Sequence, residues 1–231
     1  MTSIFIMFFR YSKWPRLYAI PGRFKNPLLI LAKLTVICVS MGYMGGYLSR
    51  MLIRLKLIPD PGPTILDYND VSQFQFFIGA VIFAPMLEEL IFRAQLKRFS
   101  GMLLFISLIF GVLLSVIVKT YWAFLISPLI FGILFMVYRF TVAGSISRKF
   151  KFWERLFPWH FHLTAVCFAL LHLANYERGI ALLPFGLLYT LPQLAIGLVL
   201  GCTRMIYGLK FSIALHSLYN LFFVAILFMR Q

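Results

Sequence analysis

Residues 76–93 read FFIGAVIFAPMLEELIFR and indicate the fold class. No charged residue precedes Glu88 in this stretch, which with its neighbours is long enough to cross a bilayer as a helix. The chain as a whole has 231 residues, is 61% hydrophobic and 13% charged, and has a mean hydropathy of +0.89. Soluble domains are about half apolar and about a quarter charged. This composition excludes an ordinary soluble enzyme, a disordered tail and a disulfide scaffold, and it favours a polytopic membrane protein.

Seven apolar segments of this kind predict transmembrane helices. They lie at residues 28–49, 72–97, 102–118, 121–138, 158–174, 180–203 and 211–229. We therefore expect an all-α polytopic membrane protein with about seven helices, in a range of six to eight, around a polar intramembrane cavity. A basic amphipathic leader, residues 1–27, is expected on the membrane surface, followed by a single transmembrane domain over residues 28–231.

The net charge of +15 arises from 22 Lys and Arg residues against 7 Asp and Glu residues. The basic residues stand between the apolar segments, where they orient helices in a bilayer, so we expect no nucleic-acid partner. If the N-terminus is cytoplasmic, 15 basic residues fall on that side and six on the other. We therefore expect an integral, multi-pass protein with a cytoplasmic N-terminus and membrane lipid as a partner, in the cytoplasmic membrane of a bacterium.

Ionisable side chains inside such segments are few, and they usually mark functional sites. The polar residues in question are Glu88, Glu89 and Arg93 in the second segment, His172 in the fifth, and His216 and Asn220 in the seventh. Glu89 and Arg93 stand four residues apart in the favourable order for an ion pair. Glu88 is turned away by about 100° and is left for chemistry. A helical rise of about 1.5 Å per residue puts the candidates at compatible depths, so we expect them to meet in one cavity facing the cytoplasm.

The spacing of these residues resembles the motifs of the CPBP (Abi) family, which includes the type II CAAX prenyl proteases. Residues 88–93, EELIFR, are similar to that family's EExxxR motif. Residues 168–172, FALLH, are similar to its FxxxH motif, and residues 216–220, HSLYN, to its HxxxN motif. The motifs follow the family's order, and the composition makes their joint chance occurrence about 1 in 10,000.

The resemblance covers mainly residues 72–98 and 158–229. Between the first two motifs, 84 residues separate Glu88 from His172, more than in many members of the family. The excess contains an extra hairpin at about residues 102–138. Two additional spans preserve the sidedness of everything downstream, so we expect the insertion to leave the site undisturbed.

The resemblance implies an intramembrane endopeptidase that hydrolyses a peptide bond of a membrane-associated protein or peptide. It implies that Glu88 acts as a base that activates water together with His172, and that His216 and Asn220 form an oxyanion pocket. General principles agree, because a carboxylate in a low-dielectric site becomes a competent base and donors aimed at a developing oxyanion lower the barrier. The candidate catalytic residues are Glu88, Glu89, Arg93, His172, His216 and Asn220.

Plainer interpretations of the same residues remain open. The glutamates and Arg93 could form a structural ion pair, and His216 with Asn220 could hold helices together. Two alternative functions follow: a non-catalytic membrane scaffold that binds a partner, and a proton-coupled transporter in which buried Glu and His relay protons. The intact motifs argue against the scaffold, and the absence of paired broken helices or an inverted repeat argues against the transporter.

We expect no cofactor. A zinc ion on Glu88, His172 and His216 is the alternative, since two histidines and a glutamate form a known catalytic set, but Arg93 nearby would oppose a cation. The chain has no HExxH and no GxSxG motif, and its aspartates all fall in one aqueous loop, residues 59–70. Its three cysteines are scattered and indicate no metal cluster.

Overall fold

A computed structural model describes residues 2–17, 26–64, 72–141 and 144–229. Throughout these residues the regular structure is helical, with no β-strand. Six described helical segments are long and apolar enough to cross a membrane. They span Pro27–Arg54, Gln73–Lys97, Phe99–Val118, Tyr121–Phe140, Ser147–Asn175 and Leu209–Phe228. The prediction of an all-α polytopic membrane protein is confirmed.

The predicted span at residues 180–203 is broken rather than straight. A short helical pair, η6 and α8 at Gly179–Tyr189, meets α9 at Leu191–Tyr207 with a bend of 64°. Pro184 stands inside the first part and Pro192 opens the second. Proline has no N–H group and disfavours a helical conformation in the preceding residue, so the main chain turns here. The described spans number six, or seven if the bent pair crosses as one unit.

The span that carries the two glutamates consists of four short pieces rather than one regular helix. Pro85 explains the irregularity, because it cannot donate a main-chain hydrogen bond. The N–H of Ala84 instead reaches back five residues to the carbonyl of Gly79, which makes a π-helical turn. In that pattern the carbonyl of Ala80 would pair with residue 85, which has no N–H group. The pieces are α3 (Gln73–Ile78), η2 (Gly79–Phe83), α4 (Ala84–Phe92) and η3 (Ala94–Lys97).

The fifth span is the end of a longer helix than the apolar pattern at residues 158–174 predicts. α7 runs from Ile146 to Leu171 and includes Pro158 in its interior. The basic stretch that separates this segment from the preceding predicted span is therefore largely helical. Lys and Arg are good helix formers, so the helix continues past the apolar segment. An apolar window marks only the part of a helix that suits lipid.

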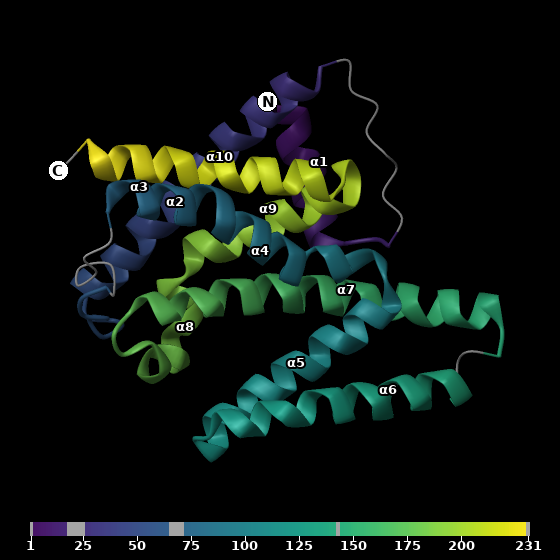
Figure 1. Cartoon of the computed structure of the whole chain (residues 1–231). Helices are drawn as coiled ribbons and strands as arrows, with labels where there is room; N and C mark the ends of the chain where they lie inside the picture. Colours follow the sequence, from purple (N-terminus) through teal and green to yellow (C-terminus); the bar gives the residue numbers. More distant parts are fainter. Residues whose placement is uncertain (1, 18–25, 65–71, 142–143, 230–231) are drawn as a thin grey trace.

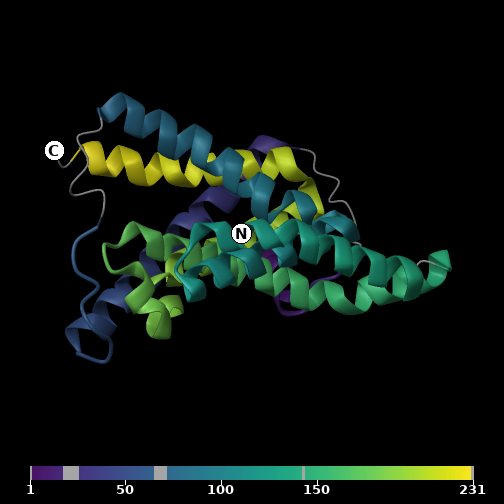
Figure 2. The same ribbon diagram turned by 60° about the horizontal axis from the view of Figure 1, so that its bottom comes forward.

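α9 lies at the centre of the bundle, where it packs against α2 (Pro27–Arg54), α7 and α10 (Leu209–Phe228). α10 runs alongside α3 and α4, so the glutamate-bearing span faces the C-terminal helix (Figure 1). α5 (Phe99–Val118) and α6 (Ser127–Thr141) form the inserted hairpin, which extends away from the bundle in Figure 1 and lies in front of it in Figure 2. The elements of the site thus come from the bundle and not from the hairpin tip.

The predicted leader, residues 1–27, contains α1 (Thr2–Lys13), which packs on the bundle. Phe8 is only 5% exposed and stacks on Tyr207 of α9, with ring centroids 6.4 Å apart. Phe5 and Phe9 of α1 are exposed instead. Residues 18–25 lie outside the described part of the chain. The leader therefore has one face on the protein, and contact of its other face with the membrane surface stays a prediction.

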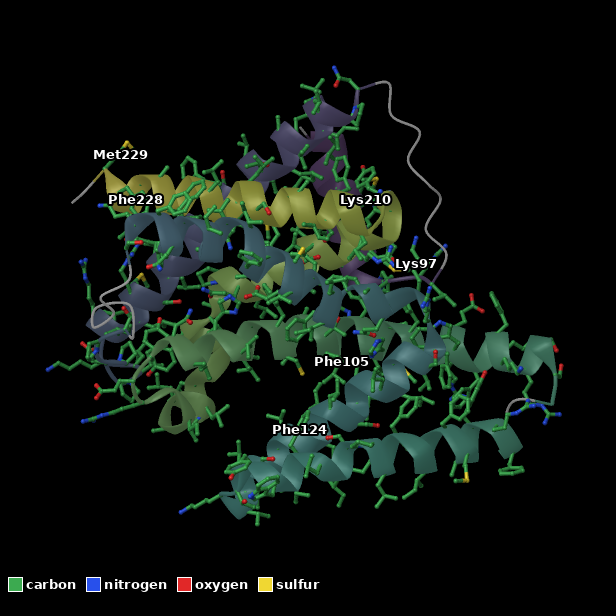
Figure 3. All side chains as sticks on the ribbon, viewed as in Figure 1. Lys97, Phe105, Phe124, Lys210, Phe228 and Met229 are labelled. Carbon is green, nitrogen blue, oxygen red and sulfur yellow. The ribbon has the colours of Figure 1, made fainter. Side chains whose placement is uncertain are left out.

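Figure 3 places Lys97 and Lys210 at one end of the bundle and Phe228 and Met229 at the opposite end. Both lysines belong to the 15 basic residues that the charge distribution predicts on the cytoplasmic side. If both lysines are cytoplasmic, they must lie at the same end of the bundle, and they do. Which way the bundle is oriented in the membrane stays a prediction.

Candidate active site

Glu89 lies at the centre of a buried polar cluster. Its carboxylate oxygen Oε1 is 3.6 Å from Nε of Arg93, so the ion pair predicted from the spacing is present. The same oxygen is 3.2 Å from Nδ1 of His216. The other oxygen, Oε2, accepts a hydrogen bond from the hydroxyl of Ser212. Glu89 is 0% exposed, and these partners satisfy a charge that would otherwise be costly inside the bundle.

Glu88 is the less engaged of the two carboxylates. Its side chain is 20% exposed, and its Oε2 atom lies 3.6 Å from Nε2 of His216. That oxygen has no hydrogen-bond partner within the described residues. The two nitrogens of one imidazole ring therefore face the two adjacent glutamates, one each.

His172 stands where α7 ends, at the first residue of a short 3₁₀ turn, His172–Asn175. Its Nδ1 atom is 2.9 Å from the carbonyl oxygen of Phe168. Because a carbonyl only accepts, Nδ1 carries the proton and Nε2 of the neutral ring presents a lone pair. The Phe168 ring contacts His172 and His216 edge-on, with centroids 4.9 and 5.7 Å away. Phe168 thus links the second histidine to the cluster.

Arg93 is held from three sides and is 1% exposed. Besides its ion pair, its guanidinium lies 4.0 Å from the centroid of the Phe168 ring and donates to the carbonyl of Gly197 at 3.2 Å. A Cβ atom at Gly197 would lie 3.0 Å from the Phe168 ring and 3.4 Å from the guanidinium. The glycine therefore allows α9 to approach the cluster closely.

Asn220 lies one turn after His216 on the same face of α10, as the spacing of four residues predicts. Both side chains face the span that carries the two glutamates. The amide nitrogen of Asn220 donates to the carbonyl of Ala80 at 2.8 Å. Ala80 is the residue whose carbonyl lacks a main-chain donor because residue 85 is proline. Asn220 therefore supplies the missing hydrogen bond, and its second amide hydrogen remains to be used by another group.

Sequence reasoning missed two residues of this region. Ser212 is fully buried and lies one turn before His216 on the same face of α10, and that spacing was an available signal. Arg204 is one of the 15 basic residues that the charge distribution predicts on the cytoplasmic side. Its guanidinium donates to the carbonyls of Arg93 at 3.1 Å and Ala94 at 3.4 Å, where α4 ends. No local sequence pattern predicts a contact between residues about 110 positions apart.

The cluster combines two carboxylates, two imidazoles and one guanidinium. Among the residues that the structure describes, no group of three His, Cys, Asp or Glu side chains is arranged to hold a metal ion. These groups can accept, donate and move protons at a polar bond.

A family model described as "Type II CAAX prenyl endopeptidase Rce1-like" matches residues 136–222. The matched segment contains His172, His216 and Asn220, whereas the pair Glu88 and Glu89 precedes it. No curated protein and no solved structure matches the chain. The resemblance predicted from the motifs is confirmed over part of the chain: residues 136–222 of this multi-pass membrane protein are similar to the Rce1-like type II CAAX prenyl endopeptidases.

Proposed function

We propose that this chain is an intramembrane endopeptidase that hydrolyses a peptide bond of a membrane-associated protein or peptide. One observation supports this most strongly: both glutamates of α4 contact the ring of His216, about 127 positions away on α10. An ion pair that only joins helices needs one carboxylate. A second carboxylate in a membrane span costs additional free energy. Its position beside a histidine suits a role in proton transfer, which explains its presence.

In this proposal Glu88 and His172 activate the attacking water. Glu88 accepts the proton, since Oε2 has no competing donor in the described structure, and the lone pair on Nε2 of His172 orients the water. His216 and the second amide hydrogen of Asn220 stabilise the oxyanion that forms at the attacked carbonyl.

Glu89 and Arg93 support these reacting groups. The carboxylate of Glu89 holds Nδ1 of His216, and Arg93 balances the charge of that carboxylate. The proposed mechanism uses no metal ion, because proton transfer by Glu88 activates the water and Arg93 disfavours a cation nearby.

One contact favours a second candidate, a non-catalytic scaffold that binds a membrane partner. Asn220 bonds to a main-chain carbonyl group of another span, as residues that serve only to join helices do. The scaffold does not explain why Glu88 is present, since its Oε2 atom accepts no hydrogen bond from another helix among the described residues.

A cleavage assay on the purified full chain in lipid vesicles tests the proposal. Two probes would be offered: an S-farnesylated peptide ending in a C-a-a-X sequence, and an unprenylated peptide that spans the membrane once. We expect wild type to cleave at least one probe and Glu88→Gln to cleave neither. Glu154→Gln is the matched control, because Glu154 is exposed on α7, and it should retain full activity. Cleavage of no probe by wild type, or equal rates in wild type and Glu88→Gln, would favour the scaffold.

A further inference from the structure

We infer that Ser212 is a positioning residue of this site, which acts through Glu89 to set the protonation of the His216 ring. Ser212 lies in the first turns of α10 and is fully buried. Its hydroxyl contacts a carboxylate about 123 positions away in the chain. The effect on turnover rests on the proposed function, whereas the effect on the ring does not.

The single hydroxyl proton of Ser212 has two acceptors within reach. One is Oε2 of Glu89, and the other is the carbonyl of Leu200 at 3.0 Å. Leu200 stands inside α9, where the helix already offers its carbonyl a main-chain N–H group. Ser212 is the hydrogen-bond donor that the structure shows for Oε2 of Glu89. A carboxylate is also the stronger acceptor, so the proton belongs on the Glu89 side.

Holding Oε2 fixes the plane of the Glu89 carboxylate and directs Oε1. Oε1 then faces Nδ1 of His216 at 3.2 Å and Arg93 at 3.6 Å. An ionised carboxylate can only accept hydrogen bonds, so Nδ1 of His216 must carry a proton. Three donors from Ser212, His216 and Arg93 thereby hold one carboxylate in one orientation.

This arrangement decides what the opposite nitrogen of His216 can do. With the proton of a neutral ring on Nδ1, Nε2 presents a lone pair toward Oε2 of Glu88, 3.6 Å away. One proton can then pass between Glu88 and Nε2, and Nε2 donates to an oxyanion once it holds that proton. If Glu89 were free to rotate, the ring proton could move to Nε2 and bind Glu88, which would occupy the base.

Nitrogen NMR of the ring tests this inference without any substrate. The full chain, labelled with ¹⁵N-histidine, contains four histidines, and the spectrum of a His216→Gln variant identifies the signals of His216. We expect wild type in detergent to show His216 protonated on Nδ1. Ser212→Ala should give a mixture of the two ring forms at His216 and leave the other three histidines unchanged.

Ser107→Ala is the matched control. Ser107 is equally buried, but its hydroxyl donates at 2.7 Å to the carbonyl of Leu103 in its own helix. Its loss should leave all four histidine signals unchanged. Ser212→Cys, which keeps a weak donor of similar size, should give an intermediate ring equilibrium. It also replaces Ser212→Ala in every comparison if the alanine variant does not fold.

The activity measurement uses the two peptide probes described above. Ser212→Ala should lower kcat about tenfold or more with little change in KM, because the reacting groups remain but are misoriented. An unchanged His216 spectrum in folded Ser212→Ala would overturn the inference, whatever the activity. If Ser212→Ala changes the His216 spectrum while wild type cleaves neither probe, the positioning role is upheld and the proposed protease function is rejected.

Discussion

Two adjacent glutamates in one apolar helix have different surroundings in this protein. Glu89 is fully buried among Arg93, His216 and Ser212, whereas the side chain of Glu88 is 20% exposed. Successive residues of a helix point about 100° apart, so neighbours in sequence meet different partners. The same substitution at the two positions should therefore have two different effects.

Glu88→Gln should abolish turnover and leave the fold nearly unchanged. Glutamine keeps the shape of the side chain but cannot accept the proton of the attacking water. Two quantities should be measured on the variant and on wild type: the rate of peptide cleavage and the thermal stability in detergent. Wild-type activity in Glu88→Gln, together with a well-folded and inactive Glu89→Gln variant, would reverse the roles that we assign.

Glu89→Gln should mainly destabilise the protein, by about 3 kcal/mol or more, because it leaves Arg93 charged and unpaired in the interior. Thermal stability in detergent measures this loss. Glu89→Gln combined with Arg93→Gln should restore part of the stability, since the unpaired charge is then removed. A double variant less stable than the single variant would contradict the ion-pair explanation.

Proteolysis should survive prolonged treatment with a strong chelator. The proposed water activation by Glu88 and His172 needs no zinc ion, and the guanidinium of Arg93 next to Glu89 repels a cation. Cleavage of the peptide probes before and after chelation is the measurement. Loss of activity that returns on addition of zinc would overturn the assignment of a metal-free site.

Among the elements, the π-helical turn η2 links local sequence to the site. Pro85 removes the main-chain donor that the carbonyl of Ala80 needs, and Asn220 of α10 replaces it at 2.8 Å. The proline therefore removes a main-chain hydrogen bond, and the side chain of Asn220, near the other end of the chain, replaces that bond. Asn220 thus has a structural role that can be measured separately from any catalytic one.

Asn220→Ala should cost about 1–3 kcal/mol of stability, because it leaves the Ala80 carbonyl without a partner. In a Pro85→Ala background the helix gains an N–H group, so the same substitution should cost distinctly less. Thermal stability of the four proteins of this cycle gives the coupling. Equal losses in both backgrounds would contradict the explanation.

The same cycle separates packing from chemistry. If the second amide hydrogen of Asn220 stabilises the oxyanion, Pro85→Ala should rescue the stability of Asn220→Ala but not its cleavage rate. Rescue of both would reduce Asn220 to a residue that only holds η2 against α10.

For the whole molecule, the distribution of basic residues predicts which end of the bundle is cytoplasmic. Ser147, at the start of α7, should be inside, and Thr120, between α5 and the following turn, should be outside. Single cysteines at these positions, in a chain whose three native cysteines are replaced, would be labelled on intact cells with an impermeant maleimide. We expect labelling at Thr120 only. Labelling of both positions from one side would contradict the seven-span topology.

The sequence by itself determined the fold class and the resemblance to a known family. A bilayer forces each span to satisfy its main-chain hydrogen bonds internally, so long apolar runs predict helices without knowledge of the partners. The pairing of Glu89 with Arg93 was predictable for the same reason, since four residues of helix bring the two side chains together. The register of His216 and Asn220 on one face of α10 also follows from a local period.

Only the tertiary structure decided how these locally defined parts combine. The bend before α9 and the π-helical turn at Pro85 interrupt apolar runs whose hydropathy shows no break, because hydropathy records burial in lipid and not the supply of N–H groups. The contacts of Ser212 with Glu89, and of Arg204 with the end of α4, join residues more than 100 positions apart. Such contacts depend on how helices pack side by side, and helical periodicity specifies a face of each helix but not the neighbour that the face will meet.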